Sequence, residues 1–144
     1  MVRTDFQATL VLAALILFAT VPGARGEDAI PWDRYSGEET VKAVTTNPDG
    51  STRETKCWLA VVGGQGFIRT GATRWGGNIE RNPEIALRIG EAELPLRVEF
   101  VTEPAEREAV KAAFRAKYGF WDGILSPLRG GSPKIMRLLP REPQ

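Results

Sequence analysis

Three short connections within roughly sixty residues constrain the fold of this chain more than any other feature of its sequence. Asn47-Pro48-Asp49-Gly50 has the composition of a tight turn, because proline presets one backbone angle and glycine adopts a positive one. Gly63-Gly64-Gln65-Gly66 is a second tight turn, and Gly90-Glu91 joins a third pair of apolar segments. Turns this short connect antiparallel strands, since parallel strands need long crossovers. The sequence therefore predicts an antiparallel meander.

The apolar segments around these turns are typical of strands, and one later segment is typical of a helix. Strands are predicted at 40–46, 57–62, 67–70, 85–89, 94–101 and 134–139, and the last of these closes the sheet. Apolar residues then recur at helical spacing, which predicts one principal helix over Pro104–Tyr118, with Thr102 as its N-cap and Gly119 just after its end. The fold class is thus mainly β (α+β), with antiparallel strands, one principal helix and short helices.

Residues 1–26 differ in composition from the rest of the chain. Ala8–Val21 carries no charge, and Ala24-Arg25-Gly26 places small residues where a signal peptidase requires them. This pattern is typical of a secretory signal peptide, and the apolar run is shorter than the ~20 residues of a membrane-spanning helix. We expect export to the periplasm or beyond, cleavage before Glu27 and no stable membrane anchor afterwards, with a retained N-terminal anchor as the alternative. Residues 27–144 have the length of a single domain.

The composition excludes several kinds of active site. The chain has no histidine and one cysteine, Cys57, so Ser-His and Cys-His nucleophiles, histidine or cysteine metal sites and an internal disulfide cannot form within one chain. Residues 1–26 hold two basic residues and one acidic residue, so the 19 basic and 18 acidic residues of the whole chain become 17 of each after cleavage. A neutral chain does not favour nucleic-acid binding. If the protein is an enzyme, a bound cofactor is expected to supply its chemistry.

Phe67–Pro83 carries the richest binding chemistry in the sequence. It reads as a strand, a turn of small residues with threonine and arginine, and a short helix that ends at Asn82-Pro83. Backbone N–H groups, two hydroxyls and a guanidinium at the start of a helix are suited to hold a phosphate. Thr73 and Arg74 are therefore expected at the anionic end of a cofactor or ligand site.

The order of elements, the residues Thr73-Arg74-Trp75, the ending Ile79–Pro83 and the helical segment Ala112–Gly119 together resemble a known family. This family is the flavin-binding split β-barrel of the pyridoxamine-phosphate-oxidase-like group, and the chain is most similar to its deazaflavin-dependent nitroreductase-like branch and to a related uncharacterised family. The resemblance spans Val41–Leu139. It implies a six- or seven-stranded antiparallel split barrel that forms a homodimer and holds FMN or a deazaflavin near the subunit interface.

The resemblance also implies which residues contact the cofactor. They are Arg53, Lys56, Thr70, Thr73, Arg74, Trp75 and Asn78. The two threonines and Arg74 correspond to phosphate contacts, and the two basic residues on the strand before Cys57 correspond to residues that face the cofactor tail. At Trp75 and Asn78 this chain departs from many relatives, which have lysine or arginine there.

Other roles remain open for these residues. Arg74 also fits a solvated turn residue, and Thr73 also fits the N-cap of the short helix. Arg53 and Lys56 also fit cross-strand pairing with glutamates. Residues expected in the core are Trp58, Phe100, Phe114 and Tyr118, whereas Lys117 is expected at the surface.

Two functions are compatible with the sequence. In the first, a reduced flavin or deazaflavin passes a hydride to a small electrophile such as a quinone or a nitro compound, and a proton comes from water or from Tyr118. In the second, the exported domain binds no cofactor and uses its barrel for a small apolar ligand or a protein partner. The sequence leaves both open.

Overall fold

The computed structural model describes residues 29–128 and 133–141, without the side chains of 120–128. The elements below belong to the compact unit Pro31–Gln144. The predicted signal peptide lies outside the described residues, so export stays a prediction. Within the described ranges, no helix is both long and apolar enough to cross a membrane.

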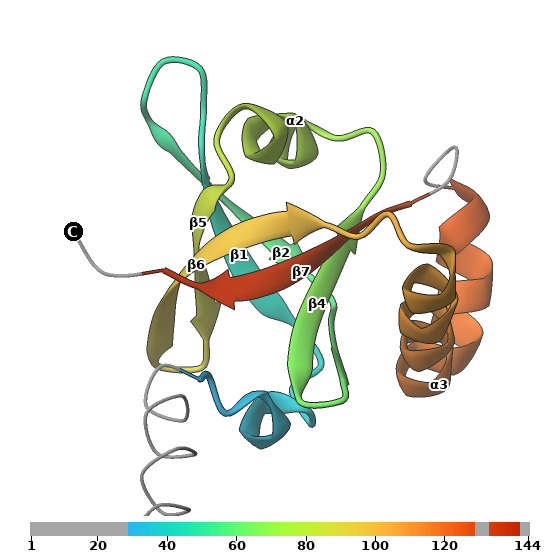
Figure 1. The fold of residues 1–144 in the computed structure, drawn as a ribbon. Helices are drawn as coiled ribbons and strands as arrows, with labels where there is room; N and C mark the ends of the chain where they lie inside the picture. The colour runs from blue at the N-terminus through green and yellow to red at the C-terminus, as the bar shows by residue number, and fades with distance from the viewer. Residues whose placement is uncertain (1–28, 129–132, 142–144) are drawn as a thin grey trace, which may run out of the picture. The chain divides into compact units, whose positions relative to one another are not determined.

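Seven strands form one antiparallel sheet that curls into a half-barrel (Figure 1). They are β1 Val41–Thr46, β2 Thr52–Cys57, β3 Leu59–Val62, β4 Gln65–Thr70, β5 Glu84–Ile89, β6 Ala92–Phe100 and β7 Lys134–Pro140. Their order across the sheet is β2-β1-β5-β6-β7-β4-β3. The helical elements are the 3₁₀ helix η1 Trp32–Tyr35, α2 Arg74–Arg81 and α3 Pro104–Leu128. The prediction of a mainly β, antiparallel split barrel is therefore confirmed, with seven strands.

The three predicted turns each connect neighbouring strands of this sheet. They join β1 to β2, β3 to β4 and β5 to β6, and every pair is antiparallel. Gly50 adopts a φ of 88° and closes its turn by donating its N–H to the carbonyl of Asn47 at 3.0 Å. This φ lies in the left-handed region that favours glycine. The local turn chemistry thus specifies three of the six strand pairings. The predicted meander is nevertheless wrong, because β1 pairs with β5 and β4 with β7, which are not consecutive strands.

The two edge strands of the sheet are neighbours in the sequence. β2 ends at Cys57 and β3 begins at Leu59, so only Trp58 separates them. An open sheet of seven strands places its edges far apart, because neighbouring strands lie about 4.8 Å apart. The sheet must therefore curl until its two edges meet at Trp58. We call this junction of the two edges at Trp58 the split of the barrel.

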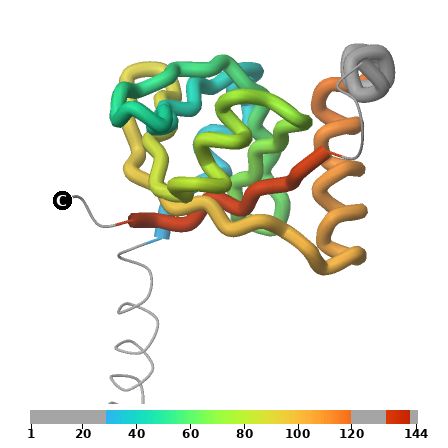
Figure 2. The backbone as a smooth tube through the Cα atoms, turned by 90° about the horizontal axis from the view of Figure 1, so that it is seen from above, coloured from blue at the N-terminus to red at the C-terminus, as the bar shows by residue number. Residues whose placement is uncertain are grey.

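Helix α3 packs against β3 beside the curled sheet (Figures 1 and 2). Phe114 is fully buried in a cluster with residues of β3, β4 and β7. The predicted N-cap, Thr102, is wrong, because Pro104 is the first helical residue and the side chain of Glu103 accepts the N–H of Glu106 at 2.9 Å. Gly119 was predicted to follow the end of the helix, and its φ of 48° does interrupt the regular helix there. A helical segment continues beyond this kink, up to Leu128.

Helix η1 is anchored on β4 by close contact between Trp32 and Gly66. Trp32 is only 3% exposed. A Cβ atom at Gly66 would lie 2.5 Å from the indole ring of Trp32. Glycine is therefore required here for close approach.

Candidate functional site

The turn between β4 and α2 is held by two threonine hydroxyls. The Oγ1 atoms of Thr70 and Thr73 are 2.6 Å apart, and Thr73 Oγ1 accepts the N–H of Gly76 at 3.1 Å. Thr73 is thus the N-cap of α2, as its alternative role predicts. The hydroxyl proton of Thr70 has two acceptors, Thr73 Oγ1 and the Gly71 carbonyl oxygen at 3.3 Å. When it points to Thr73, the hydroxyl proton of Thr73 remains available to a ligand.

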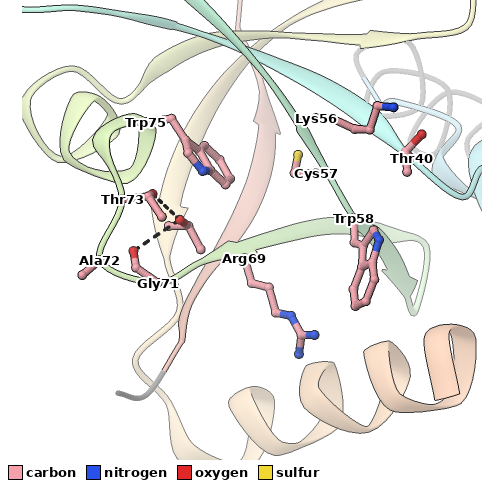
Figure 3. A pocket seen from close by; sticks show the side chains of 10 residues that line it. Thr40, Lys56, Cys57, Trp58, Arg69, Gly71, Ala72, Thr73 and Trp75 are labelled. Atoms are coloured by element: carbon pink, nitrogen blue, oxygen red, sulfur yellow. Dashed lines mark hydrogen bonds between the residues drawn. The ribbon is translucent and has the colours of Figure 1, made fainter. Parts of the chain in front are cut away.

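A cavity of about 470 Å³ lies beside this turn (Figure 3), and we call it the main cavity. It is lined by Thr40, Lys56, Cys57, Trp58, Arg69, Thr70, Gly71, Ala72, Thr73 and Trp75. The lining comes from the end of β2, the Trp58 connection, β4 and the start of α2. The main cavity therefore lies next to the split of the barrel.

Arg69 is the charged residue of the main cavity that the sequence analysis missed. It lies on β4 and is 6% exposed. Its guanidinium carbon is 4.4 Å from the ring centroid of Phe114 and 5.8 Å from that of Trp58. Figure 3 shows the side chains of Arg69 and Trp58 on the same side of β4. The available signal was a basic residue directly after the apolar pair Phe67-Ile68 of a strand. A buried arginine is rare, so its burial here is informative.

An aromatic stack closes the split of the barrel. The rings of Trp58 and Tyr118 are parallel, with centroids 4.1 Å apart. The Tyr118 hydroxyl lies 2.6 Å from the carbonyl oxygen of Glu39 and 3.1 Å from that of Leu59, and it accepts the Leu59 N–H at 3.1 Å. Burial raises the pKa of Tyr118. Because backbone groups occupy this hydroxyl, Tyr118 is not placed to supply a proton to a ligand.

Four of the expected burial assignments are wrong, because Lys117, expected at the surface, and Trp58, Phe100 and Tyr118, expected in the core, are all half-buried. Lys117 is half-buried, and its Nζ donates to the carbonyl oxygens of Glu38 at 2.5 Å and Leu59 at 2.8 Å. Desolvation lowers the pKa of its ammonium. Its long aliphatic stem lets the amine reach across to the neighbouring backbone. Phe100, expected in the core, is only half-buried at the end of β6.

Cys57 lines the main cavity as a neutral thiol. It is buried, and desolvation raises its pKa from 9.0 to about 12. The thiolate is the nucleophilic form of cysteine, so this side chain is chemically inert at neutral pH. Among the described residues, no group of three or more histidine, cysteine, aspartate or glutamate side chains can hold a metal ion.

A second hollow, of about 750 Å³, lies on the other side of the turn, and we call it the arginine cleft. It is lined by Asn47, Pro48, Asp49, Arg53, Ala72, Thr73, Arg74, Gly77, Asn78 and Arg81. The predicted site residues are thus divided between two places. Lys56, Thr70 and Trp75 line the main cavity, Arg53, Arg74 and Asn78 line the arginine cleft, and Thr73 lines both.

The predicted pairing of Arg53 and Lys56 with glutamates is wrong within the part of the chain that the structure describes. Arg53 lies opposite Thr45, and Lys56 lies opposite Lys42. The glutamate of β2, Glu54, instead forms ion pairs with Lys42 and Arg88, which lower its pKa. Both basic residues of the predicted site therefore keep their charge available.

Asn78 has a structural role. It is 1% exposed, and its Nδ2 donates to Thr45 Oγ1 at 3.0 Å and to Asn47 Oδ1 at 2.9 Å. Its own Oδ1 accepts a hydrogen bond from Arg81. Asn78 therefore ties α2 to the β1–β2 hairpin.

No protein-family profile and no curated protein sequence matches this chain. Solved structures do resemble its fold. HutZ from Vibrio cholerae, described as a heme storage protein, is 15% identical with a TM-score of 0.57, over 77% of this chain and 88% of that chain. A putative pyridoxamine 5′-phosphate oxidase from Listeria innocua is 12% identical with a TM-score of 0.52, over 73% and 86% of the two chains.

The third structure is a FAD-binding protein from Mesorhizobium loti, 10% identical with a TM-score of 0.54. The match covers 76% of this chain and 87% of that chain. Identities this low establish a shared fold and not a shared activity. The resemblance to split barrels of the pyridoxamine-phosphate-oxidase type is thus confirmed for the fold.

Proposed function

We propose that this domain binds a flavin-type redox cofactor, FMN or a deazaflavin, in the main cavity. The observation that carries the proposal is that a buried guanidinium, an aromatic ring and a hydroxyl-bearing turn line a single cavity. Trp58 offers aromatic surface to a planar ring, and Arg69 offers positive charge to its polar edge. Thr73 and Lys56 are then available to the phosphate.

A heme does not fit the described lining of the main cavity. Heme iron is held by histidine, cysteinate, methionine or tyrosine. The chain has no histidine, and the only cysteine is a buried neutral thiol. The Tyr118 hydroxyl is bonded to backbone groups, and Met136 is fully buried in the core. These residues favour a flavin over a heme.

A bound reduced flavin supplies hydride, and the proposed acceptor is a small electrophile such as a quinone or a nitro compound. The chain's own residues then bind and orient the cofactor. The buried charge of Arg69 stabilises negative charge on the cofactor, and the inert thiol of Cys57 adds apolar lining.

We further propose a homodimer, because β2 is an edge strand and such an edge needs cover. We also propose that the protein is exported through the predicted signal peptide. Mass spectrometry of the exported protein should then find Glu27 at its N-terminus.

The test is absorbance of the purified protein, followed by titration with FMN, a deazaflavin and hemin. We expect a flavin spectrum or saturable flavin binding. Arg69→Met keeps the length of the side chain and removes its charge, so it should weaken FMN binding about ten- to a hundredfold. Arg115→Met, an exposed arginine on α3, is the matched control. A colourless protein that binds neither flavin would instead favour a cofactor-free domain for an apolar ligand or a protein partner.

A further inference from the structure

Three arginines from separate points of the chain converge on the arginine cleft. Arg53 comes from β2, Arg74 is the first residue of α2, and Arg81 is its last. The two helical residues lie almost two turns apart, and the strand residue faces them from the β1–β2 hairpin. The cleft therefore gathers three permanent positive charges, one from the β1–β2 hairpin and two from α2.

These charges are not neutralised within the described part of the chain. None of the three arginines forms an ion pair there, whereas Arg88 and Arg137 each pair with two glutamates. The cleft lining includes one carboxylate, Asp49, which accepts hydrogen bonds from the N–H and the hydroxyl of Ser51 at 2.9 and 2.5 Å. Repulsion among three guanidiniums is relieved when an anion binds between them.

The cleft is also held in shape before any ligand arrives. The buried Asn78 joins the hairpin to α2 and accepts a hydrogen bond from Arg81, which fixes that guanidinium. Nε of Arg53 is buried and has no hydrogen-bond partner among the described residues. A buried donor without a partner is costly, and a ligand oxygen would satisfy it. Preorganised donors lose little entropy on binding.

We propose that the arginine cleft binds a diphosphate group. Guanidinium groups bind phosphate oxygens through paired N–H donors, and three of them exceed the charge of about −2 on a single phosphate. The group has two possible sources, a free diphosphate or the diphosphate of a dinucleotide flavin. Ala72 and Thr73 line both hollows, so the two meet at this turn, and a dinucleotide that occupies both would pass over it. This second source rests on the proposed function, whereas the first does not.

The first experiment is calorimetric titration of the full-length protein with inorganic pyrophosphate. Arg53→Gln and Arg74→Gln should each weaken binding about ten- to a hundredfold, as expected for one charge-assisted contact. Neither side chain has a hydrogen-bond or ion-pair partner in the described structure, so both variants should fold, which thermal unfolding checks. Arg115→Gln, an exposed arginine distant in sequence, should bind as wild type does. Equal affinity in all four proteins, or no binding to wild type at millimolar pyrophosphate, overturns the proposal.

The second experiment identifies the source by comparing FAD with FMN. If the group belongs to a dinucleotide, FAD binds more tightly than FMN, Arg53→Gln abolishes the difference, and pyrophosphate competes with FAD. Equal affinity for the two flavins, with pyrophosphate binding still lost in the variants, assigns the cleft to a free diphosphate. Failure of both flavins to bind overturns the proposed function alone, because the pyrophosphate titration tests the cleft by itself.

Discussion

Trp58 and Tyr118 stack face to face with an angle of 4° between their rings, and this contact fixes α3 to the split of the barrel. Trp58 is the single residue between the two edge strands, and Tyr118 lies 60 positions later, on α3 just before the kink at Gly119. The ring of Trp58 also lines the main cavity. The position of that wall therefore depends on the packing of α3.

Replacing Tyr118 separates the contribution of its ring from that of its hydroxyl. Tyr118→Phe keeps the stack on Trp58 but loses the bonds to Glu39 and Leu59, so the free energy of unfolding should fall by about 1 kcal/mol. Tyr118→Ala also removes the half-buried ring, so its loss should be larger, up to about 3–5 kcal/mol. Urea denaturation measures both. Equal losses in the two variants would show that the stack contributes nothing.

Replacing Gly66 tests the anchoring of η1. In Gly66→Ala the new Cβ would lie 2.5 Å from Trp32, so the indole must move, and unfolding should become easier by about 1–3 kcal/mol. Gly37→Ala is the control, since a Cβ there meets nothing within 4 Å. Combining Gly66→Ala with Trp32→Ala should cost less than the sum of the single changes, because the clash is then absent. Strict additivity would contradict the contact.

Cys57 should resist thiol reagents as long as the protein is folded. At pH 8 an Ellman assay should detect no reaction until denaturant is added, because burial raises the thiol pKa to about 12. The stabilisation linked to this shift is fully present when the pH is below 9.0, the ordinary pKa of the thiol, and it is lost as the pH rises toward 12. Wild type should therefore lose stability more steeply over this range than Cys57→Ala. Rapid labelling of the native protein would contradict the burial.

Thr73 combines a helix cap with a proposed phosphate contact, and Thr73→Asp separates the two. Aspartate caps helices well and its charge suits a helix N-terminus, so thermal stability should be kept or rise. The same charge repels a phosphate, so FMN binding should weaken at least about tenfold. Thr73→Ser keeps both properties and is the control. Unchanged FMN affinity in Thr73→Asp would remove the turn from the proposed site.

The sequence predicted the parts of the fold that are specified locally. The turn around Gly50 and the end of the regular helix at Gly119 depend on the backbone freedom of glycine, which is visible in a single chain. The order of the strands is not local, so the meeting of the two sheet edges at Trp58 was not foreseen. Trp58 was expected to be plain core for the same reason.

The candidate site was predicted in part. Thr70 and Thr73 were found because turn chemistry and capping are readable over a few residues. Arg69 was missed because its burial depends on α3, which is distant in the sequence. The division of the predicted residues between two hollows also could not be foreseen. It depends on how β2 and α2 lie around the turn between β4 and α2, which is a matter of tertiary structure.

The last strand of the chain lies in the middle of the sheet, and this has a consequence for biosynthesis. β7 lies between β6 and β4, so Phe67 pairs with Arg137 and Val98 with Leu138. Before β7 is in place, the sheet consists of two separate pieces, each with an open edge. A ribosome must therefore release nearly the whole domain before the barrel can close, and such pairings between distant residues slow folding. Until then both pieces keep an unpaired edge, and such edges favour aggregation.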